Sequence, residues 1–216
     1  DIHYAHPSES MDEIARLTPS FAGVSYAKID AMGSLQWPCN DHAPQGTPIM
    51  HVDRFVRGKG RFMLTEFIPT DERTGARFPL LLTTGRILSQ YNVGAQTART
   101  PNNTWHDEDV LEIHPFDAEN RGIRSGDRVL LQSRSGETTL RAEISERMQP
   151  GVVYTTFHHA RTGANVVTTD YSDWATNCPE YKVTAVQVSR TSGISAWQQE
   201  DRQRDEFLRR IERSVT

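Results

Sequence analysis

The sequence predicts a mixed, mainly β fold: a barrel of short strands with one or two small helices beside it. Composition changes at Phe78, where the apolar run 78–84 predicts a short buried strand that stops at Gly85. Brief strand patterns follow at short intervals, and two of them flank residues 134–137 as a β-hairpin. Few helical turns are predicted between the strands, which favours a barrel over a doubly wound sheet.

The later strands are indicated by short apolar or alternating runs. They are expected at 129–133, 138–144, 152–157 and 183–188. In the last run, Val183, Ala185 or Val186, and Val188 alternate as in a strand with one inward face. A short helix is predicted from Pro115 to 120, because proline suits the first helical position and Gly122 follows its end.

Residues 1–77 are expected to form a loop-rich segment with one short helix. The helix is predicted to begin near Ser10, which forms a capping-box pattern with Glu13. From 18 to 77 the chain is rich in Gly, Pro and Asp, which predicts long ordered loops over a larger body. A flexible linker is the alternative, but packing is favoured by the apolar residues Phe21, Tyr26, Leu35, Trp37, Phe55, Phe62, Leu64 and Phe67.

After the barrel domain expected at 78–189, residues 190–216 are predicted to form a helical tail. From 195 to 213, opposite charges recur four residues apart, and Phe207, Leu208 and Ile211 share a narrow apolar stripe. This pattern predicts a surface helix that is either docked on another part of the protein or free. Because the chain begins with Asp1, we expect it to be a piece of a longer protein.

Composition limits the classes of function. With 216 residues the chain can bury a core, and its net charge of -4, without clustering of one sign, argues against a nucleic-acid groove. No apolar run reaches the roughly 18 to 20 residues that cross a bilayer, so no membrane span is expected. Cys39 and Cys178 are far apart and form no CxxC motif, which gives iron-sulfur or zinc chemistry no basis within this chain. Reduced thiols favour a cytoplasmic protein.

Local motifs assign no catalytic or metal-binding residue. The sequence contains no GxSxG, HExxH or phosphate-loop pattern. His158 and His159 are neighbours in sequence, so on a strand they point to opposite faces and do not suit one shared ion. Cys39 is interpreted as a structural residue in a loop.

The most informative stretch is TGRILSQYNV at 84–93, which comes directly after a buried strand. Gly85 allows a ligand to approach the backbone closely, and Arg86 can make charge-assisted bonds to phosphate. The polar side chains nearby can orient a nucleotide. A Gly-Arg turn by itself is more often a turn with a solvated charge, so the prediction depends on further motifs along the chain.

Several motifs come after this stretch in a defined order. They are His114-Pro115-Phe116-Asp117-Ala118, then 122–129, 133–137, 157–165 and Pro179-Glu180-Tyr181-Lys182. The series resembles the molybdopterin-dinucleotide-binding domain of molybdenum and tungsten oxidoreductases. The preceding segment, with its motifs at 10–17, 23–26, 35–39 and 46–47, resembles the part before that domain in the catalytic alpha subunit of molybdenum formate dehydrogenases. The resemblance covers about residues 8 to 189 and implies that the segment 1–77 belongs to the upstream catalytic body of such a subunit.

This resemblance implies a double-psi β-barrel, with flanking short helices, that covers a molybdenum held by two molybdopterin guanine dinucleotides; tungsten is the alternative metal. Carried over by matching motifs, the cofactor-binding residues are Thr84, Gly85, Arg86, Ile87, Leu88, Gln90, Tyr91, Asn92, Val93, Phe157, Asn165, Tyr181 and Lys182. Asn165 offers a donor and an acceptor to a pterin edge, Lys182 a point charge, and Phe157 a wall against water. Taken singly, the three are explained as well by a turn, a solvated charge and core packing.

The resemblance also implies a parent enzyme that oxidises formate to carbon dioxide. Its electrons would pass through iron-sulfur clusters in the rest of the subunit and then through iron-sulfur and flavin subunits to NAD. The metal-ligating Cys of that family lies upstream of the residues matched here, so the chain alone is expected to be inactive. A nitrate reductase or another molybdopterin oxidoreductase is an alternative, although Gln90-Tyr91-Asn92 replaces the two His around a Trp found in nitrate reductases. A non-catalytic subunit-assembly module is the other alternative.

Overall fold

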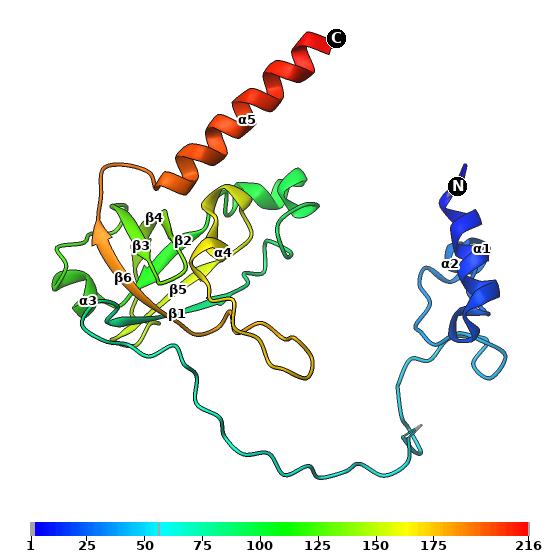
Figure 1. Ribbon diagram of the computed structural model, residues 1–216. Helices are drawn as coiled ribbons and strands as arrows, with labels where there is room; N and C mark the ends of the chain where they lie inside the picture. Colours follow the sequence, from blue (N-terminus) through cyan, green and yellow to red (C-terminus); the bar gives the residue numbers. More distant parts are fainter. Residues whose placement is uncertain (1–2, 56, 216) are drawn as a thin grey trace. The chain divides into compact units, whose positions relative to one another are not determined.

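Figure 1 shows the chain as a computed structural model that describes residues 3–55 and 57–215. The chain divides into two compact units, Asp1–Phe67 and Ile68–Thr216, and each is described here by itself. The second unit contains the barrel and the C-terminal helix. The finer division at 77 and 189, and the assignment of the first segment to an upstream body, stay predictions.

The first unit carries two helices. Helix α1 (Pro7–Leu17) starts one turn before the predicted capping box, because Pro7 occupies its first turn and His6 Nδ1 accepts the Ser8 amide at 3.2 Å. Helix α2 (Tyr26–Met32) lies where loops were predicted; Ser25 caps its start and Gly33, at φ 77°, ends it. Two turns are too short for a helical period to stand out in the sequence.

The loops of the first unit pack closely around Cys39. This residue is fully buried, and a Cβ built on Gly23 would lie 2.9 Å from Cys39 Sγ. The segment that comes next is different, because Phe62, Leu64 and Phe67 are each at least 90% exposed. The packing predicted for these three side chains is therefore not made within the described residues of this chain.

The second unit is built on a closed barrel of strands, drawn as arrows in Figure 1. The strands are β1 Leu80–Gly85, β2 Val110–Ile113, β3 Arg128–Gln132, β4 Glu137–Ile144, β5 Val152–Thr156 and β6 Thr184–Arg190. Their order around the barrel is β1-β5-β2-β4-β3-β6. The pairs β1/β5 and β2/β4 are parallel and the other neighbours antiparallel. The predicted mainly β, double-psi barrel is confirmed.

The barrel interior is filled by alternate residues of its strands, as a period of two requires. Leu80 and Leu82 of β1 and Val129 and Leu131 of β3 are at most 1% exposed. The hairpin predicted around 134–137 is the antiparallel pair β3/β4. Strand β2 was not predicted, because only four residues form it and they follow an acidic run.

Short helices flank the barrel, as predicted. Helix α3 (Pro115–Glu119) has Pro115 in its first turn, as expected, and α4 (Ala164–Val167) follows β5. Helix α5 (Ala196–Val215) confirms the predicted C-terminal helix. None of the helices in the described part of the chain combines the length and the apolar character that crossing a bilayer requires.

The first turn of α5 is fixed on the barrel. Strand β2 pairs with β4 only from Arg141 onward, so Thr139 lies beyond the end of β2. The side chain of Gln198 pairs with the backbone of Thr139, as a neighbouring strand would. Its Oε1 accepts a hydrogen bond from the Thr139 amide at 3.2 Å, and its Nε2 donates one to the Thr139 carbonyl at 3.0 Å. Trp197 lies against Gly163, where an added Cβ would overlap the Trp197 ring.

Candidate functional site

The site begins where β1 ends at Gly85. A Cβ on this residue would lie 2.5 Å from the Tyr154 hydroxyl oxygen, so the glycine is required by the approach of a protein side chain. The Tyr154 hydroxyl donates to the Arg86 carbonyl at 3.2 Å. Burial, and then the Glu112 carboxylate, raise the pKa of the Tyr154 phenol, which keeps its proton for this bond.

Arg86 stands directly after this glycine with its guanidinium held in place. The guanidinium carbon lies 5.1 Å from the centre of the Phe157 ring, a cation-π distance. Nε and one terminal nitrogen donate to Asn92 Oδ1 at 3.4 and 3.2 Å. Stacking and hydrogen bonding together orient the planar donor fork that suits a phosphate.

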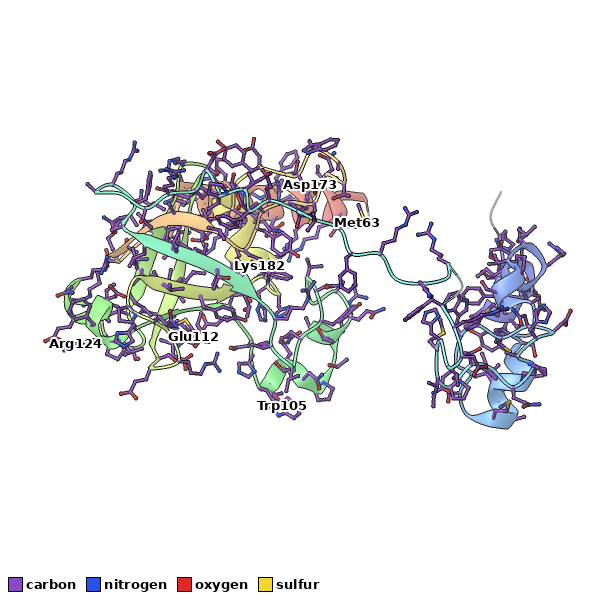
Figure 2. All side chains as sticks on the ribbon, turned by 90° about the horizontal axis from the view of Figure 1, so that it is seen from below. Met63, Trp105, Glu112, Arg124, Asp173 and Lys182 are labelled. Atoms are coloured by element: carbon purple, nitrogen blue, oxygen red, sulfur yellow. The ribbon has the colours of Figure 1, made fainter. Side chains whose placement is uncertain are left out.

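Lys182 reaches the same strand end from the loop before β6, as labelled in Figure 2. Its ammonium donates to the Thr84 carbonyl and lies 5.2 Å from the Tyr181 ring centre. The Thr84 hydroxyl donates to the Tyr181 carbonyl at 2.7 Å, so two bonds join β1 to this loop. Burial, and then the neighbouring positive charge of Arg86, lower the pKa of Lys182.

Arg86 and Lys182 therefore form a pair of neighbouring like charges. Among the described residues, no carboxylate forms an ion pair with either of them. Like charges held together at a polar surface favour an anion, which relieves their repulsion and accepts their hydrogen bonds. The pair has the chemistry of a phosphate or pyrophosphate site.

The loop after Arg86 is held by the fully buried side chain of His158. The Ile87 amide donates to His158 Nε2 at 3.1 Å, which leaves the ring proton on Nδ1 to bond the Asn92 carbonyl at 2.5 Å. Asn92 has a φ of 47°, a left-handed conformation that asparagine tolerates. One imidazole thus fixes both ends of the segment 87–92.

The predicted residues inside this loop differ in their availability to a ligand. Leu88, Tyr91 and Val93 are exposed. Gln90 is buried, and its amide is engaged inside the protein: Oε1 accepts the Thr97 hydroxyl at 2.6 Å, while Nε2 donates to Asn103 Oδ1 and the His106 carbonyl. Its side chain orders the loop from within.

Asn165 is not joined to this cluster by any contact among the described residues. It is exposed on α4, where its carbonyl accepts the Thr168 hydroxyl at 3.1 Å. The structure therefore brings together Thr84, Gly85, Arg86, Asn92, Phe157, Tyr181 and Lys182 by direct contacts. The place of Asn165 in the site stays a prediction.

Two residues that support the site were missed by sequence reasoning. His158 was weighed only as a metal ligand, and Asp109 was not predicted to have a role. The buried Asp109 carboxylate accepts the Thr156 hydroxyl, the amides of His158 and His159 at 3.1 and 3.0 Å, and His159 Nδ1 at 3.2 Å. It fixes the chain as it leaves β5. The acidic run before β2 was the one feature of the sequence that pointed to Asp109. The hydrogen-bond partners of Asp109 lie 47 to 50 positions away, so no local pattern could identify them.

Comparisons with known proteins identify relatives. The alpha subunit of F420-dependent formate dehydrogenase 1 from Methanococcus maripaludis is 37% identical over 84% of this chain, which spans 27% of that protein. The alpha subunit of F420-dependent formate dehydrogenase from Methanocaldococcus jannaschii is 36% identical over 87% of this chain, which spans 28% of it. This chain thus covers about a quarter of the length of these relatives.

Among solved structures, acetylene hydratase from Pelobacter acetylenicus matches 53% of this chain and 18% of its own, with a TM-score of 0.46 and 15% identity. The family described as Molydopterin dinucleotide binding domain matches residues 80–185, which contain the whole cluster around Arg86 and Lys182. Residues 80–185 of this chain therefore match the Molydopterin dinucleotide binding domain family, within a piece that is similar to formate dehydrogenase alpha subunits.

Proposed function

We propose that this chain is the C-terminal, cofactor-covering part of a molybdenum formate dehydrogenase alpha subunit. The observation that carries the proposal is the pair Arg86 and Lys182, two cations from different loops that meet without a carboxylate partner in the described structure. The pair fits the pyrophosphate of a pterin dinucleotide. The match of the domain family over these residues supports the same ligand class.

In this proposal the residues of the chain bind and orient the cofactor. Arg86 and Lys182 neutralise the phosphates, Phe157 shields the Arg86 guanidinium from water, and His158 keeps the loop 87–92 in shape. When bound, the molybdenum cofactor supplies the two-electron redox chemistry. The contribution of this chain to the rate is positional, because fixed polar contacts hold the cofactor against the rest of the subunit.

The proposed roles are tested by Arg86→Ala and Lys182→Ala in the complete alpha subunit. Each change removes charge-assisted hydrogen bonds worth about 1.5 to 3 kcal/mol, so cofactor affinity is expected to fall at least tenfold. The measurement is the molybdenum and pterin content of purified enzyme. Arg124→Ala is a matched control, because Arg124 is an exposed arginine in the turn before β3. Unchanged content in both Arg86 and Lys182 variants would remove the proposed roles.

The reaction proposed for the parent enzyme is the oxidation of formate to carbon dioxide. It is supported by the names of the relatives from Methanococcus maripaludis and Methanocaldococcus jannaschii, which are formate dehydrogenases. Formate oxidation and nitrate reduction by the complete enzyme are measured side by side. Nitrate reduction without formate oxidation would identify a nitrate reductase instead. Retained formate oxidation after Ile68–Thr216 is replaced by an unrelated domain would favour the assembly-module alternative.

Electron transfer and location complete the proposal. We expect electrons to leave through iron-sulfur clusters in the remainder of the subunit and to reach NAD through partner subunits. The relatives from Methanococcus maripaludis and Methanocaldococcus jannaschii are named for F420 instead, so reduction of NAD and of F420 by the purified complex is the direct comparison. Tungsten in place of molybdenum is decided by metal analysis of the same sample. A cytoplasmic location stays a prediction.

A further inference from the structure

Residues 61–68 span the boundary of the two units and expose large apolar side chains. Five of these side chains are each at least 76% exposed: Phe62, Met63, Leu64, Phe67 and Ile68. Met63 is labelled in Figure 2. A single exposed apolar side chain is common in proteins, but five within eight residues mark a surface that binds another one.

The composition of 61–68 is that of a strand and not that of a flexible linker. The segment contains no Gly, Pro or Ser, the residues that dominate flexible linkers, and it is bounded by Gly60 and Pro69. With the period of two of a strand, the apolar residues at 62, 64 and 68 lie on one face and those at 63 and 67 on the other. A strand that is apolar on both faces is suited to burial on both faces.

The backbone of this segment is unpaired as well. Within the described part of the chain, no amide or carbonyl of 61–68 forms a hydrogen bond, and the segment contains no helix, turn or strand. Backbone groups that become buried need hydrogen-bond partners, because an unpaired one costs free energy. Burial of the apolar side chains therefore requires a surface that also pairs with the backbone of 61–68.

The described part of this chain offers no sheet edge to which the segment could add. Its strands all belong to the closed barrel, in which each strand has a neighbour on both sides. A closed barrel has no free edge. A second copy brings the same closed barrel and a second segment 61–68, and a ribbon of only two strands is marginally stable in water. The sheet edge that fits this segment therefore belongs to a different part of the protein.

We propose that residues 61–68 form a β-strand that adds to an open sheet edge in the remainder of the alpha subunit. This chain spans only 27% and 28% of the two alpha subunits compared above, so most of a protein of that length lies outside it. Main-chain hydrogen bonds join the strand to the edge, and its apolar side chains enter the layers on both faces of that sheet. The inference rests on the proposed function, because the partner is the rest of such a subunit.

The first test compares hydrogen exchange of the segment in the complete subunit and in the 216-residue chain, followed by mass spectrometry. An edge strand bonds alternate amides, so about half of the amides of 61–68 are expected to exchange at least about 100-fold more slowly in the complete subunit. Equal exchange in both samples overturns the proposal. Protection already present in the 216-residue chain also overturns it, because the partner is then within the chain or in a second copy.

Thr65→Pro and Glu66→Pro in the complete subunit separate strand pairing from docking of the side chains alone. Both positions are polar, so neither change removes an apolar contact. Neighbouring amides of a strand point to opposite edges, and proline is tolerated only where the amide faces away from the partner. One variant is expected to lose the protection of 61–68 and the other to keep it, which shows that the subunit still folds. Equal loss or equal retention in the two variants overturns the proposal.

The strand and the proposed cofactor role have separate readouts. Cofactor content of Arg86→Ala and Lys182→Ala tests the cofactor role, and hydrogen exchange of 61–68 in the unaltered subunit tests the strand. Protection of 61–68 together with unchanged cofactor content in both variants supports the strand and removes the cofactor role. Lower cofactor content in the variants, without protection of 61–68 in the unaltered subunit, overturns the strand alone.

Discussion

Replacing Gln198 by leucine tests how α5 is joined to the barrel. The Gln198 amide pairs with the amide and the carbonyl of Thr139 and also accepts the Ser195 amide at 3.2 Å. Leucine is similar in size but makes none of these bonds. Each buried backbone group left unpaired costs about 1 to 3 kcal/mol, so two at Thr139 set an upper range of about 2 to 6 kcal/mol.

The observed loss is expected near the lower end, about 2 kcal/mol, because the start of α5 can lift and let water reach Thr139. Urea unfolding gives the change in the free energy of unfolding, and hydrogen exchange gives the protection of the Thr139 amide. Gln203→Leu is the matched control, since Gln203 is exposed on the same helix and its replacement is expected to stay within about 0.5 kcal/mol. Equal effects of the two changes, with Thr139 still protected, would refute the reasoning.

Three other predictions concern local geometry and charge. Gly163→Ala is expected to destabilise the chain by about 1 to 3 kcal/mol, since Gly163 has a φ of 65° and a Cβ would strike Trp197; urea unfolding that shows no loss contradicts this. The Asp173 carboxyl, bonded first by the Thr176 hydroxyl and then by backbone amides, is expected to titrate at a pKa of about 2 in carbon-13 NMR. Because this pKa is lowered, its stabilisation is complete above the unfolded value of 3.8 and lost as pH falls through about 2; a carboxyl that titrates at the ordinary value would argue against these bonds. Arg86→Gln is expected to raise the pKa of Lys182, followed by NMR of its ammonium, and no change would show that the two charges do not interact.

Much of the barrel could be predicted because its strands carry a local signal. The run before Gly85 ends as predicted, and the hairpin around 134–137 follows from its turn and its alternating flanks. Strand β2 and helix α2 carry too few residues for a period to show. Parallel pairing of β1 with β5 joins residues about 70 positions apart, so the order of the strands around the barrel was not predicted, and the type of barrel came from the resemblance.

Part of the predicted set of site residues comes together in the structure, and the residues that hold them in place were not predicted. Arg86 and Lys182 were named from their motifs, and the structure brings both to the end of β1. Gln90 was expected to face a ligand, but its amide is used inside the loop. His158 was missed because its two partners lie 66 and 71 positions away in sequence. Such contacts depend on the closed barrel and have no local pattern.

The attachment of Ile87 and Asn92 to one imidazole has a consequence for variation among related proteins. The two ring nitrogens of His158 are a fixed distance apart. Their hydrogen bonds to Ile87 and Asn92 therefore close a loop of backbone with a fixed number of residues. Insertions or deletions in this interval would detach one end, whereas side chains at the exposed positions Leu88 and Tyr91 can change freely without opening it. Homologues that keep this histidine are expected to conserve the number of residues in the interval more strictly than their identity.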